Sequence, residues 1–161
     1  MARVLRADDA DTLALAARRL AEGGLVAFPT ETVYGLGARA DDADAVAAIF
    51  EAKGRPKDHP LIVHAADLAH APRYAAELPP VALRRIAAFW PGPLTVIVPR
   101  RPGIGEAAAG GQDSIGLRCP SHPVALALLR AAHAQGVSGV AAPSANRFGR
   151  VSPTLAAHVH D

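Results

Sequence analysis

The chain has 161 residues, with 17 Lys and Arg, 15 Asp and Glu, and one cysteine. A chain of this length buries roughly 70% of its unfolded surface, so we expect a single domain over residues 1–161 with an ordinary core. The lone Cys119 excludes an internal disulfide and favours a reducing, cytoplasmic setting. No stretch approaches the roughly 20 apolar residues that cross a bilayer, so we expect a soluble protein without membrane contact.

The net charge of +2 is too small to indicate a general nucleic-acid binder. The pI of about 9.1 nevertheless leaves room for a local basic patch. Lys53 and Lys57 are the only lysines among the 17 basic residues, and both fall in one short stretch before Pro60. That stretch is either a solvated turn or part of a binding site, and composition alone leaves both interpretations open.

The predicted elements alternate between helices and strands along the chain. In order they are a helix over 10–22, a strand over 25–28, a polar, glycine-punctuated loop over 30–37, a helix over 42–53, a strand over 61–64, a helix over 81–89, a strand over 94–98, a glycine-rich loop over 103–111, a strand over 115–118, a helix over 124–134 and a strand over 140–142. Gly23, Gly54 and Gly136 mark three of the helix ends. The alternation predicts an α/β (α+β) layered domain with a mixed, twisted sheet flanked by helices.

Four polar segments follow the predicted strands or helix ends, namely 29–37, 53–64, 114–120 and 144–152. Ligands of layered α/β domains bind at such ends. The segments supply Lys, Arg, Ser, Thr, Asn and His with few carboxylates, which suits an anion such as a phosphate chain.

Other kinds of site fit the sequence poorly. The glycine pattern over 35–40 resembles a dinucleotide-binding turn but lacks the strand directly before it, and no Gly-Lys-Ser/Thr phosphate loop occurs. The seven histidines show no metal-site spacing, so we expect neither a protein-bound zinc nor an organic cofactor. Cys119 has no partner at a catalytic spacing and is expected to be a small buried packing residue.

Five ordered motifs resemble the YrdC/Sua5 family of threonylcarbamoyl-AMP synthases. They are Pro29-Thr-Glu-Thr-Val-Tyr-Gly-Leu-Gly37, Lys53-Gly-Arg-Pro with Pro60-Leu-Ile-Val-His64, Trp90-Pro-Gly-Pro-Leu-Thr95, Arg118-Cys-Pro120, and Pro143-Ser-Ala-Asn146 with Ser152-Pro-Thr154. The match runs from about residue 10 to 154. The resemblance implies a YrdC-like fold around a positive cavity, and an enzyme that condenses L-threonine, bicarbonate and ATP into threonylcarbamoyl-AMP and pyrophosphate.

The same resemblance implies partners and roles for individual residues. Mg²⁺ would accompany ATP, and the product would pass to threonylcarbamoyl-transfer machinery that modifies adenosine 37 of tRNA. Lys53 and Arg55 would be catalytic and hold the triphosphate. The further ATP-binding residues would be His59, Ser114, Ser144, Asn146 and Ser152, and the threonine-binding residues Thr32, His64, Arg118 and Ala142.

Two departures and two alternatives accompany this interpretation. His59 stands where the family often has Asn, and the chain ends before the further nucleotide contacts of family members, so we expect it to be truncated at its C-terminus. One alternative is a non-catalytic module that binds tRNA or double-stranded RNA by shape. The other is a YrdC-like domain of a larger carbamoyl-transferring protein, as in hydrogenase maturation factors. His64 itself is either a core histidine or a ligand-binding one.

Overall fold

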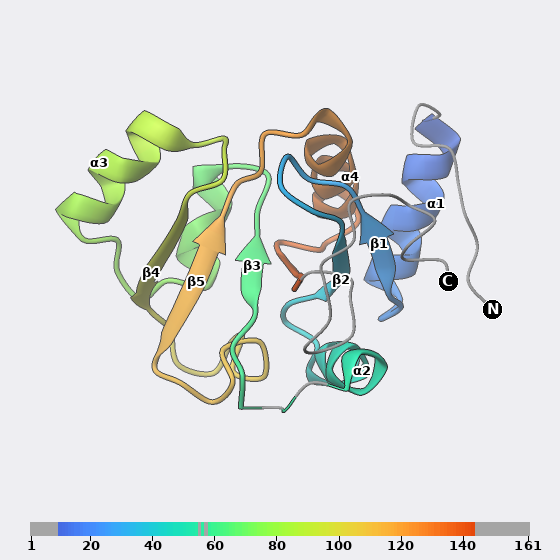
Figure 1. Ribbon diagram of the computed structural model, residues 1–161, viewed down its shortest axis with the longest axis horizontal. Helices are drawn as coiled ribbons and strands as arrows, with labels where there is room; N and C mark the ends of the chain where they lie inside the picture. Colours follow the sequence, from blue (N-terminus) through green and yellow to red (C-terminus); the bar gives the residue numbers. More distant parts are fainter. Residues whose placement is uncertain (1–9, 55, 57, 144–161) are drawn as a thin grey trace.

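The computed structural model describes residues 10–54, 56 and 58–143, whose strands form one six-stranded sheet (Figure 1). The strand order is β1-β2-β6-β3-β5-β4. The strands are β1 (Val26–Phe28), β2 (Gly35–Arg39), β3 (Ile62–His64), β4 (Thr95–Pro99), β5 (Ser114–Arg118) and β6 (Val140–Ala141). β3 and β5 pair in parallel, whereas the other neighbouring strands pair antiparallel. The predicted mixed sheet is confirmed.

The predicted helices are confirmed with small shifts at their ends. They are α1 (Ala10–Ala21), α2 (Ala43–Lys53), α3 (Pro80–Phe89) and α4 (Pro123–Ala134). The ends of α2 show why the sequence was informative. The Asp42 carboxylate accepts hydrogen bonds from the backbone N–H groups of Asp44 and Ala45, and Gly54 ends the helix with a φ of 67°.

One face of the sheet packs against α2, α3 and the 3₁₀ helix η1 (Leu68–Arg73), which the sequence analysis missed. Alternate residues of each strand point to this side, because neighbouring side chains along a strand face opposite ways. Its main buried residues are Val46, Ile49 and Phe50 of α2, Ile86 of α3, Tyr74, and the strand residues Val63, Val96, Val98, Ile115 and Leu117.

The opposite face is covered only in part by the described residues. The helices α1 and α4 pack over β1, β2 and β6, through Ala17, Leu20, Leu128 and Leu129 against Phe28, Val140 and Ala142. The strands β3, β5 and β4 continue this face beyond α4. There Ile97 of β4 is 75% exposed and pairs with Gly116 of β5, which in turn pairs with Ile62 of β3. We call this part of the sheet, lined by Ile62, His64, Thr95, Ile97, Ser114, Gly116 and Arg118, the open face.

The prediction of a loop over 30–37 is wrong for its last three residues, because β2 begins at Gly35. Glycine was taken as a loop signal, but here it makes room for packing. A Cβ at Gly37 would lie 2.7 Å from Val140 Cγ1 and 2.8 Å from Phe28 Cε1. The strand therefore requires glycine where two large side chains cross it. All but the last residue of the glycine pattern over 35–40 lie in β2, which supports its rejection as a dinucleotide-binding turn.

Candidate active site

Arg118 is the last residue of β5 and is buried at the end of the open face where that strand finishes. Its guanidinium is held on three sides. Nε donates to the carbonyl of Gly92 at 3.2 Å, Nη1 donates to Thr32 Oγ1 at 3.3 Å, and Nη2 donates to Glu31 Oε1 at 2.6 Å. A buried arginine with this many acceptors keeps its charge and has a fixed orientation.

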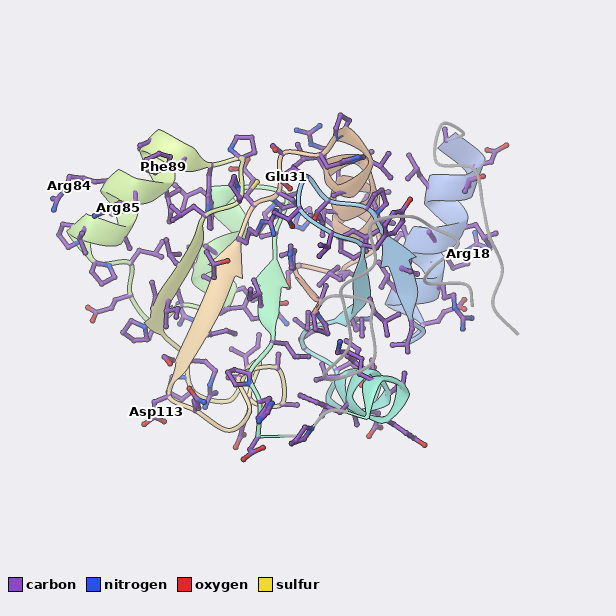
Figure 2. The ribbon with its side chains drawn as sticks, in the orientation of Figure 1. Arg18, Glu31, Arg84, Arg85, Phe89 and Asp113 are labelled. Atoms are coloured by element: carbon purple, nitrogen blue, oxygen red, sulfur yellow. The ribbon has the colours of Figure 1, made fainter. Side chains whose placement is uncertain are left out.

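Glu31 is a residue that the sequence analysis missed. It lies in the loop between β1 and β2, next to the end of the sheet where β5 finishes (Figure 2). Its side chain is 21% exposed and forms an ion pair with Arg118. Burial alone would raise the pKa of Glu31, but hydrogen bonds from Ser121 and the charge of Arg118 lower it overall. The carboxylate therefore stays ionised at neutral pH. Its place between Thr30 and Thr32 in the first motif was the available signal.

His64 is the last residue of β3 and lies beside Arg118 on the open face, since the two are register partners in the parallel pair. It is 4% exposed, and its Nδ1 has no hydrogen-bond partner in the described part of the chain. Burial, followed by the positive charge of Arg118, lowers the pKa of His64 to about 4. The imidazole is therefore neutral at pH 7 and offers a polar atom that no described side chain satisfies. A buried, unpaired polar atom of this kind is costly unless a ligand or water completes it.

The structure brings the four predicted threonine-binding residues to one region. Thr32 contacts Arg118, and Arg118 neighbours His64. Ala142 follows β6 and is buried, and its N–H donates to the carbonyl of Ile62, two residues before His64. Its methyl group belongs to the apolar cluster of Phe28. We call Thr32, His64, Arg118 and Ala142 the amino-acid subsite.

The predicted nucleotide-binding residues are described only in part. Ser114 begins β5 on the same face as Arg118, and four residues of strand separate them by about 13 Å. Lys53 ends α2, is 3% exposed and has interaction partners, and α2 lies at the end of the sheet where β5 begins (Figure 1). His59 is half-buried and also has partners. Arg55, Ser144, Asn146 and Ser152 lie outside the described residues, so their predicted roles stay predictions.

Two hollows of about 350 Å³ and 490 Å³ lie away from the open face, one beside Trp90, Cys119 and Arg130, the other between α2 and the loop at 106–111. Glu31 also balances the charge of Arg118, so this end is a neutral ion pair. The positive cavity implied by the resemblance therefore stays a prediction.

The described residues contain no group of three His, Cys, Asp or Glu side chains that could hold a metal ion. Cys119 is buried, as predicted, and its thiol donates to the carbonyl of Ala66 at 3.5 Å. Burial raises the pKa of Cys119 to about 11. The thiol is therefore protonated at neutral pH and acts as a packing residue rather than a nucleophile. No described helix is long and apolar enough to cross a membrane.

A family model described as Sua5/YciO/YrdC, telomere recombination, matches residues 18–161. The chain belongs to the Sua5/YciO/YrdC family. The threonylcarbamoyl-AMP synthase of Bacillus subtilis is 48% identical over 151 residues, which cover 92% of this chain and 42% of that protein. The crystal structure of P. abyssi Sua5 complexed with L-threonine has a TM-score of 0.89 at 46% identity, and covers 94% of this chain and 43% of that chain.

The comparisons also show how much of the relatives the chain covers and how far the fold is shared. The chain spans about two fifths of the length of these two relatives. The crystal structure of T. kodakarensis HypF has a TM-score of 0.75 at 20% identity and covers 18% of that chain, which shows a shared fold alone. The predicted YrdC-like fold is confirmed by these comparisons.

Proposed function

We propose that the protein acts as a threonylcarbamoyl-AMP synthase. The support comes from the family, from the name of the 48%-identical B. subtilis relative, and from the amino-acid subsite. The observation that carries the proposal is the pairing of a fixed Arg118 with the neutral His64, whose Nδ1 has no partner among the described residues. An arginine beside an imidazole whose Nδ1 has no partner among the described residues suits an α-carboxylate with a hydroxyl close to it, and threonine has both groups.

Each group of L-threonine has a complementary residue in this proposal. Arg118 binds the carboxylate, because a guanidinium holds a carboxylate through two parallel hydrogen bonds. His64 and Thr32 face the side-chain hydroxyl, and the methyl of Ala142 lines the apolar side of the subsite. The ion pair of Arg118 with Glu31 also favours a small zwitterion over an RNA backbone, since repeating phosphates need an excess of unpaired positive charge.

The reaction would join two anions on one face of the sheet. The amine nitrogen of threonine attacks the carbon of bicarbonate-derived CO₂ and loses a proton, which gives a carbamate. A carbamate oxygen then attacks the α-phosphorus of ATP, the bond from that phosphorus to the bridging oxygen breaks, and pyrophosphate leaves. Holding both reactants in one orientation supplies much of the rate, since it replaces encounters in solution by an intramolecular step.

The nucleotide would lie toward the start of β5. Lys53 and Arg55 would hold the triphosphate and stabilise charge on the leaving pyrophosphate, while His59, Ser114, Ser144, Asn146 and Ser152 would position the nucleotide. Mg²⁺ would accompany the nucleotide and neutralise phosphate charge. The product would pass to transfer machinery that modifies tRNA, in the cytoplasm.

Release of pyrophosphate by the full chain tests this proposal directly. ATP, L-threonine and bicarbonate are supplied together and then each is omitted in turn. The proposal expects release only when all three are present. Release from ATP that ignores threonine would overturn the substrate assignment, and RNA binding without any nucleotide-dependent reaction would favour the non-catalytic alternative.

A further inference from the structure

Glu31 connects three segments beside the amino-acid subsite. Its Oε1 accepts from Arg118 at the end of β5, and its Oε2 accepts from both the backbone N–H and the hydroxyl of Ser121, just before α4. The N–H contact measures 2.6 Å. The loop between β1 and β2 is thereby tied through one carboxylate to the end of β5 and to the turn that leads into α4.

The loop around Glu31 is itself fixed by hydroxyl groups. Thr30 donates its one hydroxyl proton to the carbonyl of Val33 at 2.7 Å. The Thr32 hydroxyl, 2.9 Å from Thr30 Oγ1, must therefore donate to it. Thr32 Oγ1 is then left to accept from Arg118, as observed. This chain of hydrogen bonds gives Thr32 one orientation and places Glu31 and Thr32 against the two terminal nitrogens of the same guanidinium.

Glu31 leaves Arg118 able to bind a substrate. A guanidinium has five N–H groups. Within the described residues, one is given to Gly92, one on Nη1 to Thr32 and one on Nη2 to Glu31. One N–H on each terminal nitrogen therefore remains for other acceptors. Glu31 therefore helps to fix the plane of Arg118 and accepts only one of its five N–H groups.

We propose that Glu31 is a positioning residue for the amino-acid substrate, acting through Arg118 and Ser121 without touching the reacting atoms. This inference rests on the proposed function. The contrary interpretation is that Glu31 competes with the substrate carboxylate for Arg118 and must leave before threonine binds. Departure would break three charge-assisted hydrogen bonds, two of which go to Ser121 and have no connection with the substrate. The geometry thus favours a permanent part of the site.

The two interpretations predict opposite effects of Glu31→Gln. The substituted amide keeps the size of the side chain but removes its charge, and it cannot accept from Arg118 and Ser121 together without turning an NH₂ group toward one donor. If Glu31 is a positioning residue, we expect this change to raise the KM for threonine at least tenfold, while the KM for ATP stays within about twofold. Glu31→Asp, which retains the charge but is one methylene shorter, should raise the KM for threonine by an intermediate factor.

Asp41→Asn is the matched control. Asp41 forms ion pairs with Arg39 and Arg73, and its side chain is 15% exposed, close to the 21% of Glu31. It is expected to lower the melting temperature without changing the KM for threonine. Should Glu31→Gln not fold, Ser121→Ala removes one of the three hydrogen bonds and is expected to raise the KM for threonine about threefold.

Pyrophosphate release is measured with threonine and ATP varied separately for the full chain and each variant. A rise confined to the KM for threonine, absent in Asp41→Asn, supports the inference. An unchanged or lower KM for threonine in Glu31→Gln overturns it, as does an equal rise for both substrates. If the unaltered protein shows no dependence on threonine, the proposed function fails and this inference fails with it. The two failures are therefore distinguishable.

Discussion

Arg118 combines burial with a full charge, and its three acceptors explain how the fold tolerates both. The acceptors come from two segments, the loop that holds Glu31 and Thr32 and the turn at Gly92, so the side chain depends on the planar five-donor shape of guanidinium. An ammonium group has three donors and no fixed plane. Arginine at this position is therefore a requirement of geometry as well as of charge.

Arg118→Lys is predicted to weaken threonine binding at least tenfold while retaining the positive charge. A lysine side chain has too few donors to hydrogen-bond Gly92, Thr32 and Glu31 and also bind a carboxylate through two hydrogen bonds. Calorimetric titration with L-threonine measures the effect. Arg39→Lys is the control, since Arg39 pairs with Asp41 and with the carbonyl of Ala21. Equal affinities of Arg118→Lys and the unaltered protein would contradict the role of Arg118.

His64 makes stability depend on pH. Its folded-state pKa of about 4 lies below the ordinary 6.5. As the pH falls below 6.5 the unfolded chain takes up the proton first, so stability is fully present above pH 6.5 and is lost progressively down to about pH 4. The loss is up to about 3 kcal/mol, at about 1.4 kcal/mol per pH unit.

Urea unfolding at pH 7.5 and pH 5 measures this loss for the protein and for His64→Gln. His70, whose pKa is also lowered by burial, contributes to both and cancels in the difference. We expect a shallower pH dependence in His64→Gln. The same dependence in both proteins would mean that His64 is not buried as a neutral imidazole.

At the scale of elements, the helices were predictable because their signals are local. The Asp42 cap and the αL Gly54 fix the ends of α2 through contacts within a few residues. The strand β2 was missed because the residues that require its glycine lie far away in the sequence. Gly37 is required by Phe28 of β1 and Val140 of β6, far apart in the sequence. The 3₁₀ helix η1 is short and contains Pro72, so its sequence shows no helical periodicity of apolar residues that could have predicted it.

Gly37→Ala is predicted to destabilise the protein by about 1–3 kcal/mol, because the new methyl group would overlap both neighbouring side chains. Gly116→Ala is the matched control within the same sheet. Its Cβ would approach Thr95 Cγ2 at 3.3 Å and Ile62 Cγ1 at 3.7 Å, so a smaller loss is expected. Chemical denaturation compares the two. Equal losses would contradict the packing explanation of β2.

At the scale of the molecule, the order of strands could not be read from the sequence. The last described strand, β6, inserts between β2 and β3, and this pairing brings Ala142 to the amino-acid subsite. The resemblance supplied Thr32, His64, Arg118 and Ala142, and the structure brings them together. Glu31 was missed because the sequence was searched for cations that bind phosphate, whereas its role depends on a contact with Ser121 across the fold.

The assembled subsite is predicted to discriminate between amino acids of equal shape. L-Threonine should raise the melting temperature, and L-valine, in which a methyl replaces the hydroxyl, should bind at least tenfold more weakly. A site that hydrogen-bonds a hydroxyl leaves its own polar atoms unpaired with the analogue. Thermal denaturation with increasing amounts of each ligand gives the comparison. Equal shifts would contradict the role given to His64 and Thr32.

The most direct test of the account is a crystal structure of the full chain with L-threonine. We expect the carboxylate to be bound by Arg118, the hydroxyl to face His64 and Thr32, and Glu31 to remain bound to Arg118 and Ser121. Threonine bound away from the open face, or bound there with its carboxylate turned from Arg118, would contradict it.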